Sequence, residues 1–191
     1  NVSHDLKTPL TSIINYVDLL KKEDIQGEKA QEYIEVLDRK SQRLKKLTED
    51  LVEASKASTG TLTVNPERLG VTQLVTQALG EYSEKLSAAG LTVISTLTEE
   101  EVYVQADGRH FWRILDNLMG NCVKYAMPET RIYLDLVAWD GYVTLSLKNI
   151  SASQLNIPAE QLMERFVRGD ESRTTEGSGL GLSIARSLTE L

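Results

Sequence analysis

The sequence predicts a helical hairpin followed by an α+β sandwich. Two stretches, residues 6–20 and 34–51, repeat apolar side chains at steps of three and four residues, which is typical of amphipathic helices. A small, polar segment at 55–60 follows them. Beyond it, short runs rich in β-branched residues alternate with helical patterns, which favours a mixed sheet covered on one face by helices.

The composition limits the classes of function. The chain has 191 residues, of which 41% are hydrophobic and 26% charged, so it can form one large domain or two small ones. The chain has a formal net charge of -7 and lacks the stripes of basic residues that bind phosphate backbones. This argues against nucleic acid as the main partner. Its single cysteine, Cys122, lies in an apolar helical pattern, so we expect a reducing compartment and a packing role.

The first helix is expected to carry a histidine away from its apolar stripe. That stripe comprises Leu6, Leu10, Ile13, Val17 and Leu20. Steps of three or four residues from His4 lead instead through polar side chains, so we expect its imidazole at the surface or in a groove. A histidine in such a place is commonly inert, but the neighbours of His4 favour chemistry. Asp5 can accept its Nδ1 hydrogen and leave the Nε2 lone pair free to attack, and Thr8 places a hydroxyl on the same face.

Residues 3–10, with the sequence SHDLKTPL, resemble the H-box of sensor histidine kinases. Members of that family move phosphate from ATP to a histidine and then to an aspartate of a response regulator. The resemblance implies that His4 is the phosphoacceptor and that Asp5 is its acid/base partner. It also implies that Thr8 helps to position water when the same helix dephosphorylates the regulator.

A short connection near residues 22–28 leads into the second helix. The apolar stripe of this helix has a period near 3.5 residues and comprises Ile34, Leu37, Ser41, Leu44, Leu47 or Thr48, and Leu51. Two such helices form an antiparallel hairpin that cannot cover its own stripe. We therefore expect two copies to pair into a dimeric four-helix bundle, with packing against the rest of the same chain as the alternative. This domain is expected to span residues 1–57, and the second domain residues 58–191.

The second domain is expected to alternate strands and helices. The expected strands cover residues 61–64, 91–97, 102–106, 131–138 and 142–148, and the expected helices cover 71–86, 107–126, 158–166 and a last segment from about 179. Asp107 is a candidate cap for the helix that follows it, and Asp140 with Gly141 predicts a tight turn between the last two strands.

The helix at 107–126 carries two asparagines one turn apart. Phe111, Leu115, Leu118 and Cys122 form its expected buried stripe, and Asn117, Asn121, Lys124 and Tyr125 lie together on another side. Asparagine is a poor interior helix residue, and its carbonyl oxygen beside a lysine can hold a metal-bound triphosphate, although a solvated polar face is the alternative. Residues 117–125, NLMGNCVKY, resemble the N-box of the GHKL (Bergerat) ATPase fold. The resemblance implies Asn121 as the Mg²⁺ ligand, with Asn117, Lys124 and Tyr125 around the phosphates and ribose of ATP.

A glycine cluster precedes the last expected helix. It comprises Gly177, Ser178, Gly179, Leu180, Gly181 and Leu182, and glycines at a helix start let backbone N–H groups approach phosphate. The cluster resembles the G2 box of histidine kinases, and residues 164–168 resemble their F-box, which implies a mobile lid over ATP at 169–176. Arg168 or Arg173 could reach the γ-phosphate, and either could equally be an ordinary surface arginine.

The chain departs from the family after the strand that ends near Lys148. The family usually has Asp-x-Gly-x-Gly there, whose aspartate accepts the adenine amino hydrogen, whereas residues 149–153 read NISAS. The Asn149 carbonyl can still accept that hydrogen. The family's ATP-binding domain also has a last β-hairpin that these residues do not contain.

Together the H-box, the N-box and the G2 box imply the core of a sensor histidine kinase that uses ATP and Mg²⁺, phosphorylates itself, and exchanges phosphate with a response regulator. The expected partners are a second copy of the chain and the receiver domain of that regulator. The alternative is a degenerate kinase that acts as a dimeric scaffold or as a phosphatase only. Because the sequence begins inside a helix, we expect the cytoplasmic domain of a bacterial membrane receptor, with its membrane segments outside these residues.

Overall fold

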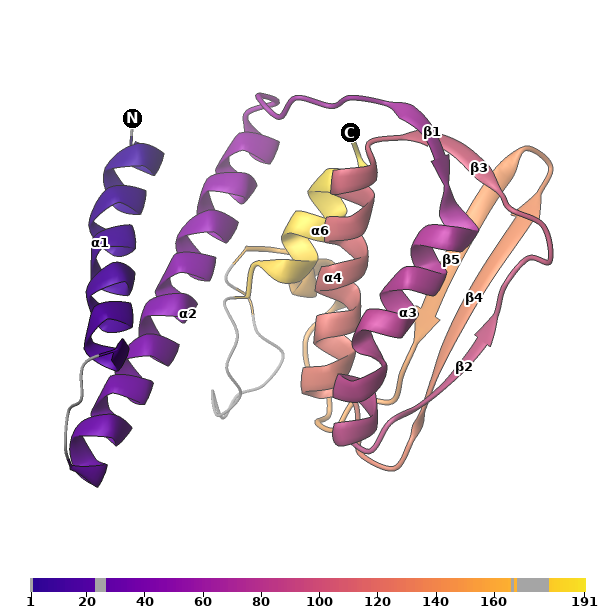
Figure 1. Ribbon diagram of the computed structural model, residues 1–191. Helices are drawn as coiled ribbons and strands as arrows, with labels where there is room; N and C mark the ends of the chain where they lie inside the picture. The colour runs from indigo at the N-terminus through magenta and orange to yellow at the C-terminus, as the bar shows by residue number, and fades with distance from the viewer. Residues whose placement is uncertain (1, 23–26, 166, 168–178) are drawn as a thin grey trace. The chain divides into compact units, whose positions relative to one another are not determined.

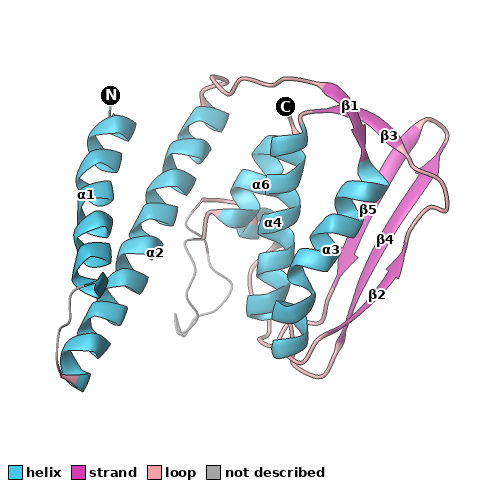
Figure 2. Ribbon diagram, viewed as in Figure 1, coloured by secondary structure: helices cyan, strands magenta, loops and turns pink. Residues whose placement is uncertain are grey.

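The computed structural model describes residues 2–22, 27–165, 167 and 179–191, without the side chains of residues 2–9 and 58. The chain divides into two compact units, Asn1–Thr59 and Gly60–Leu191. The first unit contains helices α1 (Val2–Lys22) and α2 (Glu28–Ser58), and the second contains the strands and the remaining helices (Figures 1 and 2).

The two helices of the first unit form a hairpin with a narrow contact face. The apolar residues buried between them are Leu10, Val17, Ile34 and Ala54. Lys21 Nζ lies 2.6 Å from Asp38 Oδ2, which joins α1 to α2 by an ion pair. Most of the expected stripes remains accessible, because Ile13, Leu20, Leu37, Leu44 and Leu51 are between 41% and 51% exposed. The hairpin therefore leaves much of its apolar surface uncovered within one chain.

The second unit contains two small sheets (Figure 2). Strand β1 (Glu67–Gly70) pairs antiparallel with β3 (Tyr103–Ala106). The other sheet has the order β2-β4-β5 and comprises β2 (Thr92–Thr96), β4 (Arg131–Trp139) and β5 (Tyr142–Lys148). Because β2 is parallel to β4 and β5 is antiparallel to it, this sheet is mixed, as the sequence predicted.

Helices α3 (Val71–Ala88) and α4 (Gly108–Tyr125) cover one face of the three-stranded sheet (Figure 1). The core between them consists of Val71, Val75, Ala78, Tyr82 and Leu86 from α3, Leu115, Met119 and Cys122 from α4, and Ile132, Leu134 and Leu136 from β4. The last helix, α6 (Gly181–Thr189), packs against α4. This packing holds the start of α6 near the polar side of α4, where the candidate site lies.

Four expectations need correction. Residues 61–66 form no strand, and β1 begins after Pro66, since proline cannot donate to a ladder. The short helix α5 covers only Ala159–Leu162, and Phe166 lies outside the described residues. Helix α6 begins at Gly181, because Gly179 adopts a φ of 69° that a helix does not allow. Within α4, Met119 is fully buried, whereas the expected stripe members Leu118 and Phe111 are only half-buried.

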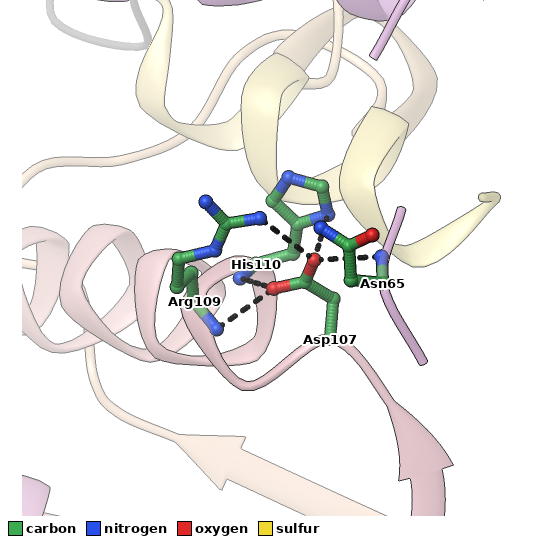
Figure 3. Close-up of polar contacts among 4 residues, drawn as sticks. All are labelled: Asn65, Asp107, Arg109 and His110. Atoms are coloured by element: carbon green, nitrogen blue, oxygen red, sulfur yellow. Dashed lines mark hydrogen bonds and ion pairs between the residues drawn. The ribbon is translucent and has the colours of Figure 1, made fainter. Parts of the chain in front are cut away.

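Asp107 caps α4, as predicted, and also holds a distant segment (Figure 3). Its Oδ1 accepts hydrogen bonds from the backbone N–H groups of Arg109 at 3.0 Å and His110 at 3.3 Å. Its Oδ2 accepts from the backbone N–H of Asn65 at 3.0 Å and from the Arg109 guanidinium at 3.2 Å. The Asn65 bond and then the Arg109 bond lower the pKa of Asp107 well below its ordinary value, despite its burial. One carboxylate thus fixes both the start of α4 and the chain segment that enters the second unit.

Candidate functional site

The polar side of α4 carries the four residues that the sequence singled out. Asn117, Asn121, Lys124 and Tyr125 occupy the C-terminal half of the helix, opposite the buried positions of Leu115, Met119 and Cys122. Asn117, Asn121 and Tyr125 are half-buried and Lys124 is exposed. The site therefore offers two amides, a phenol and an ammonium along one side of a single rigid helix.

Asn117 stands against the start of α6. A Cβ added to Gly181 would lie only 3.3 Å from Asn117 Oδ1, so the backbone of α6 approaches this amide closely. The Nδ2 atom of Asn117 is buried and has no hydrogen-bond partner among the residues that the structure describes. A buried donor without a partner costs about 1–3 kcal/mol, so this amine is suited to an acceptor that a ligand supplies.

The beginning of α6 is a second place for an anion. Gly179 has a positive φ of 69°, and the buried Leu180 accepts hydrogen bonds through its carbonyl from Ile184 N and Ser183 Oγ, each at 2.9 Å. In the described part of the chain no side chain caps this helix, which leaves the N–H groups of Gly181 and Leu182 directed along the helix start. Backbone donors at such a terminus bind phosphate oxygens well.

Several predicted residues lie outside the described part of the chain. These are Arg168, Arg173, Gly177 and Ser178, together with the expected lid at 169–176. Their roles remain predictions from the sequence.

Asn149 lies beside α4, where it contacts Cys122, a residue 27 positions earlier in the sequence. It directly follows β5, and its Oδ1 is 3.8 Å from the Sγ atom of Cys122. Burial raises the pKa of Cys122 to about 11, so the group is a neutral thiol near pH 7. The structure thus brings Asn149 next to the helical turn that carries Asn121.

The hairpin carries the predicted phosphoacceptor on its first helix. His4, Asp5 and Thr8 lie in the first two turns of α1, and their side chains are outside the described part of the structure. Farther along α1, Thr11, Asn15 and Asp18 are exposed, in agreement with the polar face expected for the side of the helix that carries His4.

The donor set fits a metal-bound triphosphate better than a bare metal ion. Among the described residues no group of three or more His, Cys, Asp or Glu side chains could hold a metal by itself. Mg²⁺ commonly keeps few protein ligands and takes the rest from water and substrate phosphates. One amide oxygen from Asn121, with the unpartnered Asn117 donor and the start of α6 nearby, is suited to that arrangement.

Sequence reasoning missed two contacts. Cys122 was expected to serve packing alone, and nothing in the sequence pointed to Asn65 as a partner of Asp107. The signal available for Cys122 was its position directly after Asn121 in the N-box. The Asn65 contact has no sequence signal, since it joins the backbone of one residue to a side chain 42 positions away.

The described helices include none that is both long enough and apolar enough to cross a lipid bilayer.

Two family models match the chain. The His Kinase A (phospho-acceptor) domain matches residues 1–60, and the histidine kinase-, DNA gyrase B- and HSP90-like ATPase matches residues 106–191. The sensor protein VanSC of Enterococcus gallinarum is 32% identical over 193 residues, which cover 98% of this chain and 52% of that protein. The sensor histidine kinase YvrG of Bacillus subtilis (strain 168) is 30% identical over 193 residues, which cover 100% of this chain and 33% of that protein.

Solved structures share the fold. Full-length ShkA in complex with AMPPNP superimposes with a TM-score of 0.84 at 22% identity, over 99% of this chain and 39% of ShkA. The histidine kinase AdeS of Acinetobacter baumannii gives a TM-score of 0.64 at 20% identity, over 97% of this chain and 85% of AdeS.

The fold and the two matched domains define the class, a phosphoacceptor hairpin joined to a GHKL-type ATPase domain. These two domains, together with the similarity to sensor kinases, support a sensor histidine kinase catalytic core. The chain spans about half or less of the length of the curated relatives it matches.

Proposed function

We propose that this chain is an ATP-dependent protein-histidine kinase core, with the phosphoacceptor hairpin at residues 1–57 and the ATP-binding domain at 58–191. The observation that carries the proposal is the buried amide nitrogen of Asn117, which has no hydrogen-bond partner among the described residues and lies beside the start of α6 at Gly181. That arrangement is suited to acceptor oxygens, and it occurs in a chain whose residues 1–60 match a phosphoacceptor domain.

Residues of both α4 and α6 bind Mg²⁺ and ATP. Asn121 supplies the oxygen ligand for the metal, and Asn117 and Lys124 donate to phosphate oxygens. The N–H groups of Gly181 and Leu182 bind the same phosphates at the start of α6. When bound, Mg²⁺ neutralises the charge that develops on the triphosphate.

The remaining predicted residues complete the site. Tyr125 lies against the ribose, and the Asn149 carbonyl accepts a hydrogen from the adenine amino group. Either Arg168 or Arg173 contacts the γ-phosphate, and Gly177, Ser178, Gly179 and Leu180 form the turn around the phosphates. These roles follow from the resemblance of the motifs to those of the family.

The chemistry itself belongs to the hairpin. Asp5 holds the Nδ1 hydrogen of His4, so that the Nε2 lone pair can attack the terminal phosphorus in line with the departing ADP oxygen. The phosphoryl group then passes to an aspartate of a response regulator. Thr8 positions water when the hairpin removes phosphate from that regulator.

The hairpin also supplies the dimer interface. Its exposed apolar residues lie on both helices and include Ile13, Tyr16, Leu37, Leu44 and Leu51. A second copy of the hairpin can cover these side chains in a four-helix bundle. The relatives are named as sensor proteins, so we propose that this core is the cytoplasmic output of a larger membrane sensor whose signal-receiving part lies outside these residues.

Transfer of labelled phosphate tests the proposal. Incubation with Mg²⁺ and ATP labelled at the γ position is expected to leave an acid-labile, alkali-stable label on the chain. His4→Gln should abolish the label while ATP binding stays within about twofold, because the two functions belong to separate units. His110→Gln is the matched control, since it removes the only other histidine and should keep the label.

Label that persists in His4→Gln would show that another residue accepts the phosphate. The scaffold alternative is not favoured, because both domains of a histidine kinase match the chain and the N-box asparagines lie together on α4. It would gain support if the chain bound ATP without ever acquiring label.

A further inference from the structure

The loop that carries Asn149 is fastened to the end of α4. The backbone N–H of Met127 donates to the carbonyl of Ile150, and that of Ala152 donates to the carbonyl of Tyr125, each at 2.8 Å. A bridge between Ala126 and Ser151 lies between these two bonds. Asn149 therefore keeps a fixed distance from the helix unless these backbone bonds break.

Cys122 contacts the Asn149 side chain. It is 3% exposed, and its Sγ is 3.8 Å from the carbonyl oxygen of the amide. Because burial keeps the sulfur protonated, its hydrogen is available to that oxygen. The carbonyl end of the amide thus points toward α4. The Nδ2 atom forms the opposite end of the amide, and none of the residues that the structure describes accepts a hydrogen bond from it.

An amide and a carboxylate present different chemistry to a purine. A carboxylate offers only acceptors, whereas an amide offers acceptors and two donors. Adenine has a donor amino group at its 6-position, and guanine has an acceptor oxygen there. Opposite the 6-position of the base, an aspartate at position 149 would therefore pair with the amino group of adenine and repel the oxygen of guanine. In its present orientation the Asn149 NH₂ group can donate to the guanine oxygen. If the amide rotates by half a turn, its carbonyl can accept from the adenine amino group.

We propose that Asn149, oriented by Cys122, makes this nucleotide site accept guanine nucleotides as well as adenine nucleotides. The inference rests on the nucleotide site proposed above. A thiol is a weak donor, so turning the amide for adenine costs little and both bases are accommodated. In this account Cys122 is a positioning residue, and Asn149 contacts the base.

Binding of two imido analogues tests the inference. Affinities of the full chain for AMPPNP and GMPPNP, with Mg²⁺ present, are measured by titration calorimetry. The wild-type dissociation constants are expected to agree within about tenfold. Asn149→Asp should raise the preference for AMPPNP by at least about tenfold, because a site that lacks the matching donor rejects the analogue that needs it.

The two cysteine variants should change the preference in opposite directions. Cys122→Ala removes the donor and frees the amide to turn, which shifts the ratio toward AMPPNP. Cys122→Ser supplies a stronger donor and shifts the ratio toward GMPPNP. Leu115→Val is the control, since it removes one carbon from the same buried side of α4 away from Asn149 and should leave the ratio unchanged.

The binding results distinguish the inference about guanine, the positioning role of Cys122 and the proposed function. Wild-type protein with the same strong AMPPNP preference as Asn149→Asp overturns the inference and leaves the nucleotide site in place. Equal ratios in the alanine and serine variants of Cys122 overturn the positioning role. Failure of the wild-type chain to bind either analogue contradicts the proposed function itself.

Discussion

Asn117 is the residue on which the nucleotide site depends most. Its oxygen faces the missing Cβ of Gly181, and its nitrogen is buried without a partner in the described part of the chain. Asparagine is costly in the middle of a helix, and among the described residues none accepts a hydrogen bond from its Nδ2 to offset that cost. The Asn117 Nδ2 atom, whose burial costs stability, is thus one that a phosphate oxygen of a ligand can satisfy.

Gly181→Ala tests this close approach. The added methyl would lie 3.3 Å from Asn117 Oδ1, so the amide or the start of α6 must shift by a few tenths of an ångström. We expect ATP affinity to fall by about tenfold or more while the protein stays folded, as measured by calorimetry and thermal unfolding.

Gly80→Ala is the matched control for that substitution. Gly80 is exposed on α3, and a Cβ there would meet nothing within 4 Å, so this change should stabilise the helix by about 0.5–1 kcal/mol and leave ATP affinity unchanged. Unchanged affinity in Gly181→Ala as well would show that the start of α6 does not contact the nucleotide.

The sequence was sufficient to place the polar residues of this site on one helix, because helical spacing alone groups positions 117, 121, 124 and 125. It was not sufficient to place Asn149. The contact between Cys122 and Asn149 depends on β5 ending beside α4. Hydrophobic periodicity does not indicate which distant elements pack together.

At the scale of elements, α4 is the part that the second unit is built around. Its buried side contributes to the core against α3 and the sheet, its polar side carries the candidate site, and its first turn is fixed by Asp107. Because Asp107 also binds Asn65, the segment that enters the second unit is attached to the same helix.

Asp107→Ala should destabilise the second unit in a pH-dependent way. Loss of a helix cap costs about 1–2 kcal/mol, measured by urea unfolding near pH 7. The pKa of Asp107 is lowered in the folded state, so its contribution is complete above its ordinary pKa of 3.8 and declines as the pH falls below that value. The difference between wild type and variant should therefore shrink on going from pH 7 to pH 3.

Glu84→Ala is the control for that comparison, because Glu84 is exposed on α3 and caps no helix. A cost for Asp107→Ala that is the same at pH 3 as at pH 7 would contradict the role of the ionised carboxylate.

Element types were largely predictable, and their limits were less so. The hairpin, the α3 and α4 helices and the β4-β5 pair follow the predicted patterns closely. The expected strand at 61–64 failed because alternation alone does not supply a partner, and β3 pairs instead with 67–70. Met119 replaces Leu118 in the core because contacts with distant elements, which helical periodicity does not report, select the buried side of α4.

At the scale of the whole molecule, the exposed apolar stripe of the hairpin is the feature on which the proposed dimer depends. Leu37 and Leu44 of α2 are 49% and 51% exposed, although they lie in the pattern expected for a core. A monomeric soluble protein rarely leaves a long apolar stripe open to water. The proposed dimer would bury these residues and bring two copies of His4 into one bundle.

Leu44→Glu tests the dimer. A charge in the proposed interface should convert a dimer to a monomer at micromolar concentrations, seen by light scattering with size exclusion, because an unpaired buried carboxylate is costly. Lys45→Glu places the same side chain on an exposed neighbouring position and should leave the dimer intact. A monomeric wild-type chain would contradict the proposed interface.

The central claim is that this chain places the terminal phosphate of ATP on one imidazole nitrogen. Peptide mapping by mass spectrometry under neutral conditions, after incubation of the unaltered chain with Mg²⁺ and ATP, measures that most directly. The account predicts phosphohistidine in the peptide that contains His4. Phosphate found only on His110, or on a serine, threonine or tyrosine, would contradict it.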